Sequence, residues 1–267
     1  MSRTSGRSRP SAGKIGRIRD DQFDRWIASL EARHLADLTF AEVSRALRAL
    51  SSAYVERRRR LAEGAALAGA GKRAAFALFY GPMHYLLVRN IARKLSPSAP
   101  SPSTIVDLGC GTGAAGAAWA TAIDGPPELV GIDRHPWAVA EAKWTYRHFA
   151  LNARVERRDI ASAVLPRHPA AIVAAFTINE VRDDAGRDAL LKKLVDRAAH
   201  GDRVLVVEPL AGFVAPWWGR WRDVVLRAGG RADEWRFRIE LPAIVRKLDR
   251  AAGLDHRELM ARSLSLG

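Results

Sequence analysis

A short apolar strand followed by three alternating glycines constrains this chain more than any other feature. Residues 104–108 read Thr-Ile-Val-Asp-Leu, which is typical of the end of a buried strand. Gly109, Gly111 and Gly113 follow, and glycine lets bare backbone turn tightly and approach a ligand closely. The small residues from 114 to 120 predict a helix whose N-terminal N–H groups face the same turn. This arrangement predicts a nucleotide-type site at the carboxyl edge of a parallel sheet.

The stretch from Asp107 to Gly113, Asp-Leu-Gly-Cys-Gly-Thr-Gly, resembles motif I of the class I S-adenosylmethionine (SAM) methyltransferases. In that family an acidic residue, any residue and then Gly-x-Gly-x-Gly follow an apolar strand. The resemblance implies an α/β fold with a Rossmann-like, doubly wound sheet, SAM as the cofactor and methyl transfer as the reaction. It also implies that the three glycines admit the amino-acid end of SAM and that Asp107 balances its positive charge.

Residues 111–116 also match the G-x-G-x-x-G fingerprint of dinucleotide-binding proteins. Two features favour SAM over a dinucleotide. Asp107 would repel a pyrophosphate but attract a sulfonium and an ammonium group, and the dinucleotide pattern does not require Gly109. A purely structural glycine turn is the third interpretation.

Two later strand ends supply further candidates for cofactor binding. Asp133 ends a predicted strand over 129–133, where a carboxylate can accept hydrogen bonds from both ribose hydroxyls. Its alternative role is to cap the helix predicted from Pro136. The resemblance implies that Asp159 and Ile160, after a third strand, contact the adenine amine and ring face; the alternative for Asp159 is an ordinary loop position.

The end of the predicted fourth strand faces the methyl group in this superfamily, and here it reads Phe-Thr-Ile-Asn-Glu over 176–180. Asn179 and Glu180 are therefore our candidate catalytic residues, one to orient the acceptor and one to remove a proton. The alternative is that Glu180 only caps the next helix. The Asn/Asp-Pro-Pro-Tyr/Phe signature of many amine methylases is missing, and so is the ligand spacing of a metal site.

Residues 179–181 (Asn-Glu-Val), 207–209 (Val-Glu-Pro) and 211–213 (Ala-Gly-Phe) narrow the resemblance. They are similar to the methyltransferase-like family of mitochondrial and bacterial small-ribosomal-subunit assembly proteins, over roughly residues 40–215. Complete members carry a C-terminal cysteine set for an iron–sulfur cluster. This chain has one cysteine, Cys110, so the cluster is not expected.

Positive charge is concentrated before the glycine loop. The chain has a net charge of +14, and residues 1–102 hold 19 Lys and Arg against 8 Asp and Glu. Such asymmetry predicts a polyanionic partner, namely RNA or the small ribosomal subunit. The candidate contacts are Arg57, Arg58, Arg59, Arg60 and His84. The alternatives are a solvated arginine-rich face and, for His84, a structural position among aromatic side chains.

Composition divides the chain into four segments. Residues 1–19 predict a disordered basic arm, 20–95 a helical substrate-recognition region, 96–103 a Pro/Ser linker and 104–267 the SAM-binding domain. Thr39 and Glu42 predict a capping box, and Gly81-Pro82 predicts a bend or break in a helix over 72–94. We expect further strands over 153–156, 170–176 and 203–207, helices over 136–149, 183–199, 214–228 and 242–252, and an antiparallel edge strand from the tail 256–266.

No apolar run is long enough to span a bilayer and no signal peptide is visible, so we expect a cytoplasmic protein. No metal is implied. The favoured function is a SAM-dependent methyltransferase acting on an unidentified acceptor, for which ribosomal RNA or a ribosome-associated substrate is our candidate. The alternatives are a non-catalytic assembly factor that binds RNA and a small-molecule methyltransferase.

Overall fold

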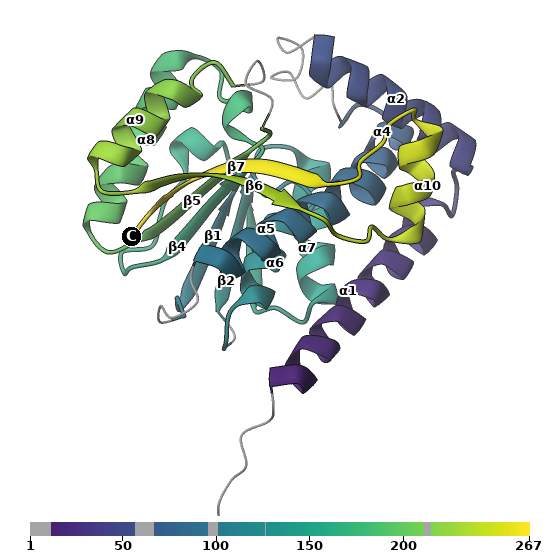
Figure 1. The fold of residues 1–267 in the computed structure, drawn as a ribbon, viewed down its shortest axis with the longest axis horizontal. Coiled ribbons are helices and arrows are strands. Elements are labelled where there is room, and N and C mark those ends of the chain that lie inside the picture. Colours follow the sequence, from purple (N-terminus) through teal and green to yellow (C-terminus); the bar gives the residue numbers. More distant parts are fainter. Residues whose placement is uncertain (1–11, 57–66, 96–100, 126, 211–214) are drawn as a thin grey trace, which may run out of the picture.

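The computed structural model describes residues 12–56, 67–95, 101–125, 127–210 and 215–267 (Figure 1). These residues form one seven-stranded sheet in the order β3-β2-β1-β4-β5-β7-β6. The first five strands run parallel, and β7 is antiparallel to both of its neighbours. The strands are β1 Thr104–Leu108, β2 Glu128–Asp133, β3 Ala153–Arg157, β4 Ala171–Ala175, β5 Arg203–Glu208, β6 Arg231–Phe237 and β7 Leu259–Leu266. The doubly wound α/β fold is confirmed.

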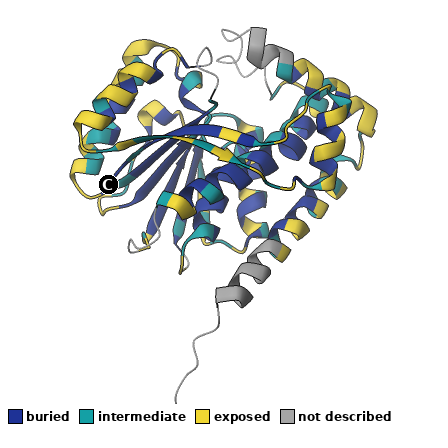
Figure 2. Ribbon diagram, viewed as in Figure 1, coloured by how far each residue is buried: buried dark blue, intermediate teal, exposed yellow. Residues whose placement is uncertain are grey.

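Each face of the sheet has its own apolar core, because successive strand residues point to opposite faces. Ile105 and Leu129 belong to the core shared with the N-terminal helices, α6 and α7, and Val106 and Val130 to the core shared with α8 and α9. Figure 2 shows the buried strands between these layers. The helices after β1 are α6 Ala114–Ala122, α7 Pro136–His148, α8 Asp184–Ala199, α9 Trp218–Arg227 and α10 Ala243–Ala251, with 3-10 turns at Ile160–Ser162 and Ile178–Glu180.

The N-terminal region is helical, but its first helix begins earlier than we predicted. The elements are α1 Ala12–His34, α2 Phe40–Glu56, α4 Ala70–Ala75, a π-helical turn η2 at Phe76–Tyr80 and α5 Gly81–Leu95. Residues 12–19 therefore continue a helix where the sequence predicted a disordered arm. Once the buried part of α1 has nucleated, each further residue adds a hydrogen bond at small cost, which explains the extension. Residues 1–11 of the predicted arm lie outside the described residues.

The N-terminal helices and the α/β sheet share one apolar core. The Trp26 ring of α1 lies 5.6 Å from the ring of Tyr85 in α5 and 5.4 Å from that of Phe149, which follows α7. The Tyr85 hydroxyl is 2.8 Å from the Thr121 hydroxyl of α6. The Pro/Ser segment, of which only 101–103 are described, joins two parts packed tightly together (Figure 1).

Two local predictions for the N-terminal helices can be checked directly. Thr39 and Glu42 form the capping box before α2, since each side chain accepts a hydrogen bond from the other residue's backbone N–H, at 3.3 and 2.8 Å. Gly81-Pro82 does not break its helix. Instead the turn before it widens to a π-helix, with the Gly81 N–H donating to the Phe76 carbonyl. The wider turn accommodates a proline that has no N–H to donate.

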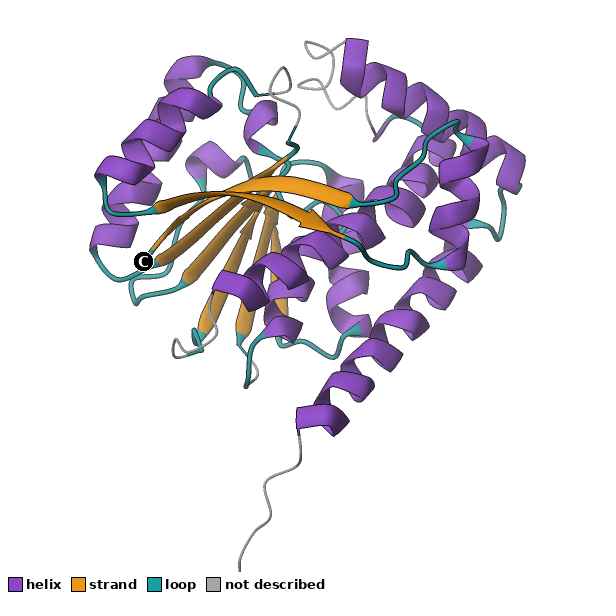
Figure 3. Ribbon diagram, in the orientation of Figure 1, coloured by secondary structure: helices purple, strands orange, loops and turns teal. Residues whose placement is uncertain are grey.

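The C-terminal strand differs from the prediction in its position. The tail is antiparallel as expected, but β7 lies between β5 and β6, and β6 forms the edge (Figure 3). We predicted no strand over 231–237. Its residues Arg-Ala-Asp-Glu-Trp-Arg-Phe are mostly polar because an edge strand is half solvated, which hides it from a search for apolar runs.

Candidate functional site

The glycine loop is fixed to the end of β2 by backbone and side-chain hydrogen bonds. The Gly109 and Cys110 N–H groups both donate to the Ile132 carbonyl, at 2.8 and 3.0 Å. The Gly111 N–H donates to Asp133 Oδ2 at 3.0 Å, and the His135 N–H donates to Asp133 Oδ1 at 2.8 Å. Asp133 is thus held by two backbone N–H groups beside the loop. The residue that caps α7 is His135, not Asp133.

Packing requires glycine at two of the three alternating positions. A Cβ at Gly109 would lie 1.9 Å from Thr177 Oγ1, and one at Gly113 would lie 2.8 Å from the Tyr146 ring. Gly111 is different, because its Cβ would meet only the ring of Phe76, at 3.6 Å, and the residue is partly exposed. Gly111 is therefore the glycine whose bare backbone faces the open side of the loop.

Asp107 lies beneath the loop, almost completely buried. Its Oδ2 accepts hydrogen bonds from the Gly116 N–H at 2.8 Å and the Tyr146 hydroxyl at 3.0 Å. Its Oδ1 is buried with no hydrogen-bond partner among the described residues. Burial raises the pKa of Asp107 to about 7, with a smaller contribution from the Asp133 charge, while the two hydrogen bonds act in the opposite direction.

This raised pKa predicts how stability varies with pH. The folded state keeps a proton on Asp107 up to about pH 7, whereas the unfolded chain loses it near pH 4, so the free energy of unfolding falls as pH rises from 4 to 7. In Asp107→Asn that contribution is absent. Urea unfolding at pH 5 and pH 8 should show wild type losing on the order of 1 kcal/mol more than the variant. Equal losses of unfolding free energy in wild type and variant would contradict the raised pKa of Asp107. Burial also raises the pKa of Glu208, to about 8, but Glu208 is present in both proteins, so its contribution is the same in each.

The third strand end carries Asp159 and Ile160. The Asp159 side chain is exposed, and its Oδ1 accepts the Ala161 N–H at 2.9 Å, capping the short 3-10 turn. Ile160 is mostly buried. The Arg158 N–H donates to the Asp133 carbonyl at 2.9 Å, which places this end next to that of β2. Asp159 therefore acts as a local cap, and its contact with adenine stays a prediction.

The end of β4 carries the two candidate catalytic residues in different environments. The Asn179 amide donates to Glu208 Oε2 at 3.2 Å and accepts from Trp217 Nε1 at 2.8 Å, so it is tied to the buried side. The Glu180 side chain is 48% exposed and lies 3.9 Å from Arg134. Partial burial of the carboxyl, and then the Asp133 charge, raise the pKa of Glu180 to about 7, and Arg134 acts in the opposite direction.

The tryptophans after β5 are structural. Trp217, Trp218 and Trp221 are all buried against the sheet face that α8 and α9 cover.

His84 lies at the open side of the end of β4. Its ring stacks on Phe176 with centroids 3.9 Å apart and planes 14° from parallel. Burial lowers the pKa of His84 to about 3, so the imidazole stays neutral at physiological pH. Phe76, Trp137 and Phe176, which surround the loop, were not among our candidates. Phe76, Tyr80 and His84 recur every four residues, a helical spacing that marks a common face; nothing in the sequence marks Phe176.

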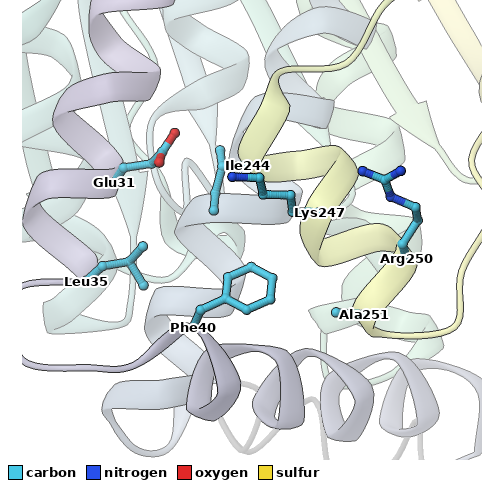
Figure 4. Close-up of a pocket in the computed structure, with 7 residues that line it drawn as sticks. All are labelled: Glu31, Leu35, Phe40, Ile244, Lys247, Arg250 and Ala251. Carbon is cyan, nitrogen blue, oxygen red and sulfur yellow. The ribbon is translucent and has the colours of Figure 1, made fainter.

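Other predicted or possible sites lie elsewhere. Arg57, Arg58, Arg59 and Arg60 lie outside the described residues. An open groove of about 680 Å³ between α1, α2 and α10 is lined by Glu31, Leu35, Phe40, Ile244, Lys247, Arg250 and Ala251, none of them a predicted cofactor contact (Figure 4). In the part of the chain that the structure describes, no cluster of His, Cys, Asp and Glu could hold a metal ion, and no helix has the length and apolarity to cross a bilayer.

Comparison with known proteins agrees with the glycine-loop geometry. Residues 105–201 match a family model described as a methyltransferase domain. No curated protein sequence matches the chain.

Solved structures match over larger parts of the chain. The plantazolicin methyltransferase BpumL, solved with a pentazolic desmethyl analogue and S-adenosylhomocysteine (SAH), has a TM-score of 0.53 at 11% identity over 82% of this chain and 98% of its own. The N-methyltransferase NodS from Bradyrhizobium japonicum WM9, solved with SAH, has a TM-score of 0.47 at 14% identity over 68% of this chain and 87% of its own. A TehB-like SAM-dependent methyltransferase from Corynebacterium glutamicum has a TM-score of 0.42 at 18% identity over 70% of this chain and 98% of its own. The likeness to BpumL shows a shared fold.

Proposed function

We propose that this chain is a class I SAM-dependent methyltransferase and that it transfers the methyl group of SAM to RNA. The observation that carries the RNA assignment is charge placement: residues 1–102 contribute +11 of the net +14. The helices of this region do not stand apart from the glycine loop, since the ring of Phe76 lies against Gly111. A polyanion bound by the basic region would therefore lie beside the site of methyl transfer.

The residues around the loop fit SAM. The buried Asp107 Oδ1 has no hydrogen-bond donor among the residues that the structure describes, and the methionine end of SAM carries an ammonium group. Asp133 is partly exposed and fixed by two backbone N–H groups, while each carboxylate oxygen keeps a lone pair for a ribose hydroxyl. The acceptors of the protein thus match the donors of the cofactor. When bound, SAM supplies an electrophilic methyl group on a sulfonium.

The contribution of the chain itself is positioning, exclusion of water and proton removal. Asp133 and the loop would orient the cofactor, and the partly exposed rings at the end of β4 would limit water around the acceptor. Glu180, with its pKa near 7, is suited to receive a proton from the acceptor, because a general base works best when its pKa is close to the working pH.

Removing the Asp133 carboxylate tests the ribose contact. We expect Asp133→Ala to weaken SAH binding by ~1–3 kcal/mol, since buried polar groups of the ligand lose their partner. Isothermal titration calorimetry measures this, with NAD as a ligand that should not bind. Asp133→Asn separates the ribose contact from loop anchoring, because the amide oxygen keeps one acceptor. The surface variant Asp188→Ala on α8 is the matched control, and unchanged affinity in Asp133→Ala would remove the assignment.

Neutralising the arginine run tests the RNA partner. We expect the quadruple change of Arg57, Arg58, Arg59 and Arg60 to Gln to weaken binding to every RNA sequence alike and to flatten the salt dependence. Each lost phosphate contact removes about 0.7–0.9 from the slope of log K against log salt. Filter binding at several salt concentrations gives the slope, and calorimetry with SAH should show no change. If RNA binding is the same at every salt concentration, the run is a solvated face.

Turnover separates this proposal from its main alternative, an RNA-binding assembly factor that transfers nothing. With labelled SAM and total RNA from a deletion strain, a methyltransferase incorporates label into RNA. The assembly factor would bind RNA and SAM without incorporation, and a small-molecule enzyme would label only the metabolite fraction.

A further inference from the structure

Five partly exposed aromatic rings form a continuous band across the carboxyl edge of the sheet. Ring centroids are 6.5 Å apart for Trp137 and Phe76, 6.3 Å for Phe76 and His84, 6.0 Å for Tyr80 and His84, and 3.9 Å for His84 and Phe176. The five residues come from α7, the N-terminal helices and the end of β4. None of them is fully buried. We call these five residues the aromatic band.

The aromatic band crosses the glycine loop where the methyl group would be delivered. Phe76 lies beside Gly111, whose N–H is bonded to Asp133, and Phe176 directly follows β4. Phe176 has a φ of +59°, in the left-handed region that residues other than glycine rarely adopt. Its N–H donates to the Val207 carbonyl at 2.8 Å, and His84 stacks on its ring. The fold therefore holds this ring in place against its backbone preference.

Cationic side chains gather beside the aromatic band. Burial lowers the pKa of His135, and Arg73, Arg134 and Arg157, from three different segments, lower it further while Asp133 opposes them. His135 is two residues from Trp137 of the band. Positive charge next to exposed rings is the combination by which proteins hold single-stranded nucleic acid, with phosphates on the cations and bases on the rings.

We infer that the aromatic band binds an unpaired base of single-stranded RNA and that a nitrogen of this base is the methyl acceptor. The inference rests on the proposed function and specifies its substrate. An uncharged small molecule would make no use of the arginines, whereas the phosphates of RNA would pair with them. Stacking on rings favours a planar base over a ribose hydroxyl as the group brought to the site.

The chemistry of the chain favours nitrogen over carbon in the base. Methylation at a pyrimidine carbon generally needs a cysteine that first adds to the ring, and the only cysteine, Cys110, is buried in the glycine loop with its pKa raised by burial. A base nitrogen needs no such step. Its lone pair forms the new N–C bond, the C–S electron pair leaves with SAH, and the proton released from nitrogen passes to Glu180.

A matched pair of probes tests whether the aromatic band binds a base. Fluorescence anisotropy, with saturating SAH, compares a ten-nucleotide single-stranded RNA with an abasic oligonucleotide of the same length and charge. We expect wild type to prefer the base-bearing probe by about 10-fold or more, the range of one stacked base. Phe176→Gly relieves the backbone strain and removes the ring, so its preference should fall to about two-fold or less with the abasic affinity unchanged. Phe176→Tyr should keep the preference.

Further variants separate stacking from charge and folding. If Phe176→Gly fails to fold, Phe76→Leu in another element of the aromatic band tests the same point. It should also lose the preference for the base-bearing probe. Arg157→Gln should weaken both probes equally, and Lys247→Gln in the groove between α1, α2 and α10 should weaken neither. Equal binding of both probes by wild type overturns the inference, as does nucleoside analysis that finds the methyl group on ribose or on protein. Failure of wild type to bind SAH would instead overturn the proposed function.

Discussion

The Glu180→Gln variant is expected to lose about 10²- to 10⁴-fold in the rate of methyl transfer, the usual contribution of a general base. The glutamine side chain keeps the shape of glutamate but cannot take a proton. In wild type the rate should rise with pH and level off above about 7, because the pKa of Glu180 is raised to about 7 and only the ionised form accepts a proton. The variant should lack this rise. Single-turnover rates with labelled SAM and RNA between pH 5.5 and 8.5 measure both effects.

Cofactor binding provides the control for this variant. Replacing Glu180 with glutamine removes a like charge from the neighbourhood of Asp133, so SAH affinity should not fall. Glu240→Gln, at an exposed ion pair with Arg246, is the matched change elsewhere on the surface and should keep the full rate. A Glu180→Gln enzyme with more than half of the wild-type rate would show that the acceptor loses its proton directly to water.

The centre of the sheet could be predicted from the sequence because parallel strands covered on both faces must be apolar throughout. β1, β2, β4 and β5 were predicted within two residues of their bounds for this reason. The edge strand β6 was missed because one side of it is solvated and carries Glu234 and Arg236. The alternation of Trp235 and Phe237, whose rings stack 5.9 Å apart, was the available signal.

The site was predictable where a backbone motif defines it and not where distant segments meet. Asp107 and Asp133 lie at or next to the ends of the adjacent strands β1 and β2, and their contacts with SAM stay predictions. The aromatic band was not predicted, because its members are far apart in the chain. Phe176 is also positioned by a positive φ, which the sequence does not indicate at a phenylalanine. The Pro/Ser segment predicts a boundary between the helical region and the SAM-binding domain, but composition does not reveal how much apolar surface the two sides bury against each other.

That shared surface contains a buried charge, and loss of its partners should affect stability more than any other change proposed. Glu141 of α7 is completely buried, and its Oε1 lies 2.7 Å from His34 Nε2 while its Oε2 lies 3.4 Å from Arg33 Nε, both at the end of α1. Arg33 also lies over the Trp144 ring at 5.2 Å. These contacts join the first helix to the helix that follows Asp133.

The double variant Arg33→Ala/His34→Ala should lose about 3–5 kcal/mol of unfolding free energy, because it leaves a buried carboxylate without a partner. Adding Glu141→Gln to that background should recover part of the loss, since an amide costs less to bury than an unpaired charge. Urea unfolding of the single, double and triple variants measures both effects, and the recovery distinguishes the charge from lost packing of the Arg33 and His34 side chains. If the double variant loses less than about 1 kcal/mol, or the triple variant is no more stable than the double, then apolar contacts such as Trp26 with Phe149 hold α1 in place, and the ion pair contributes only to its register.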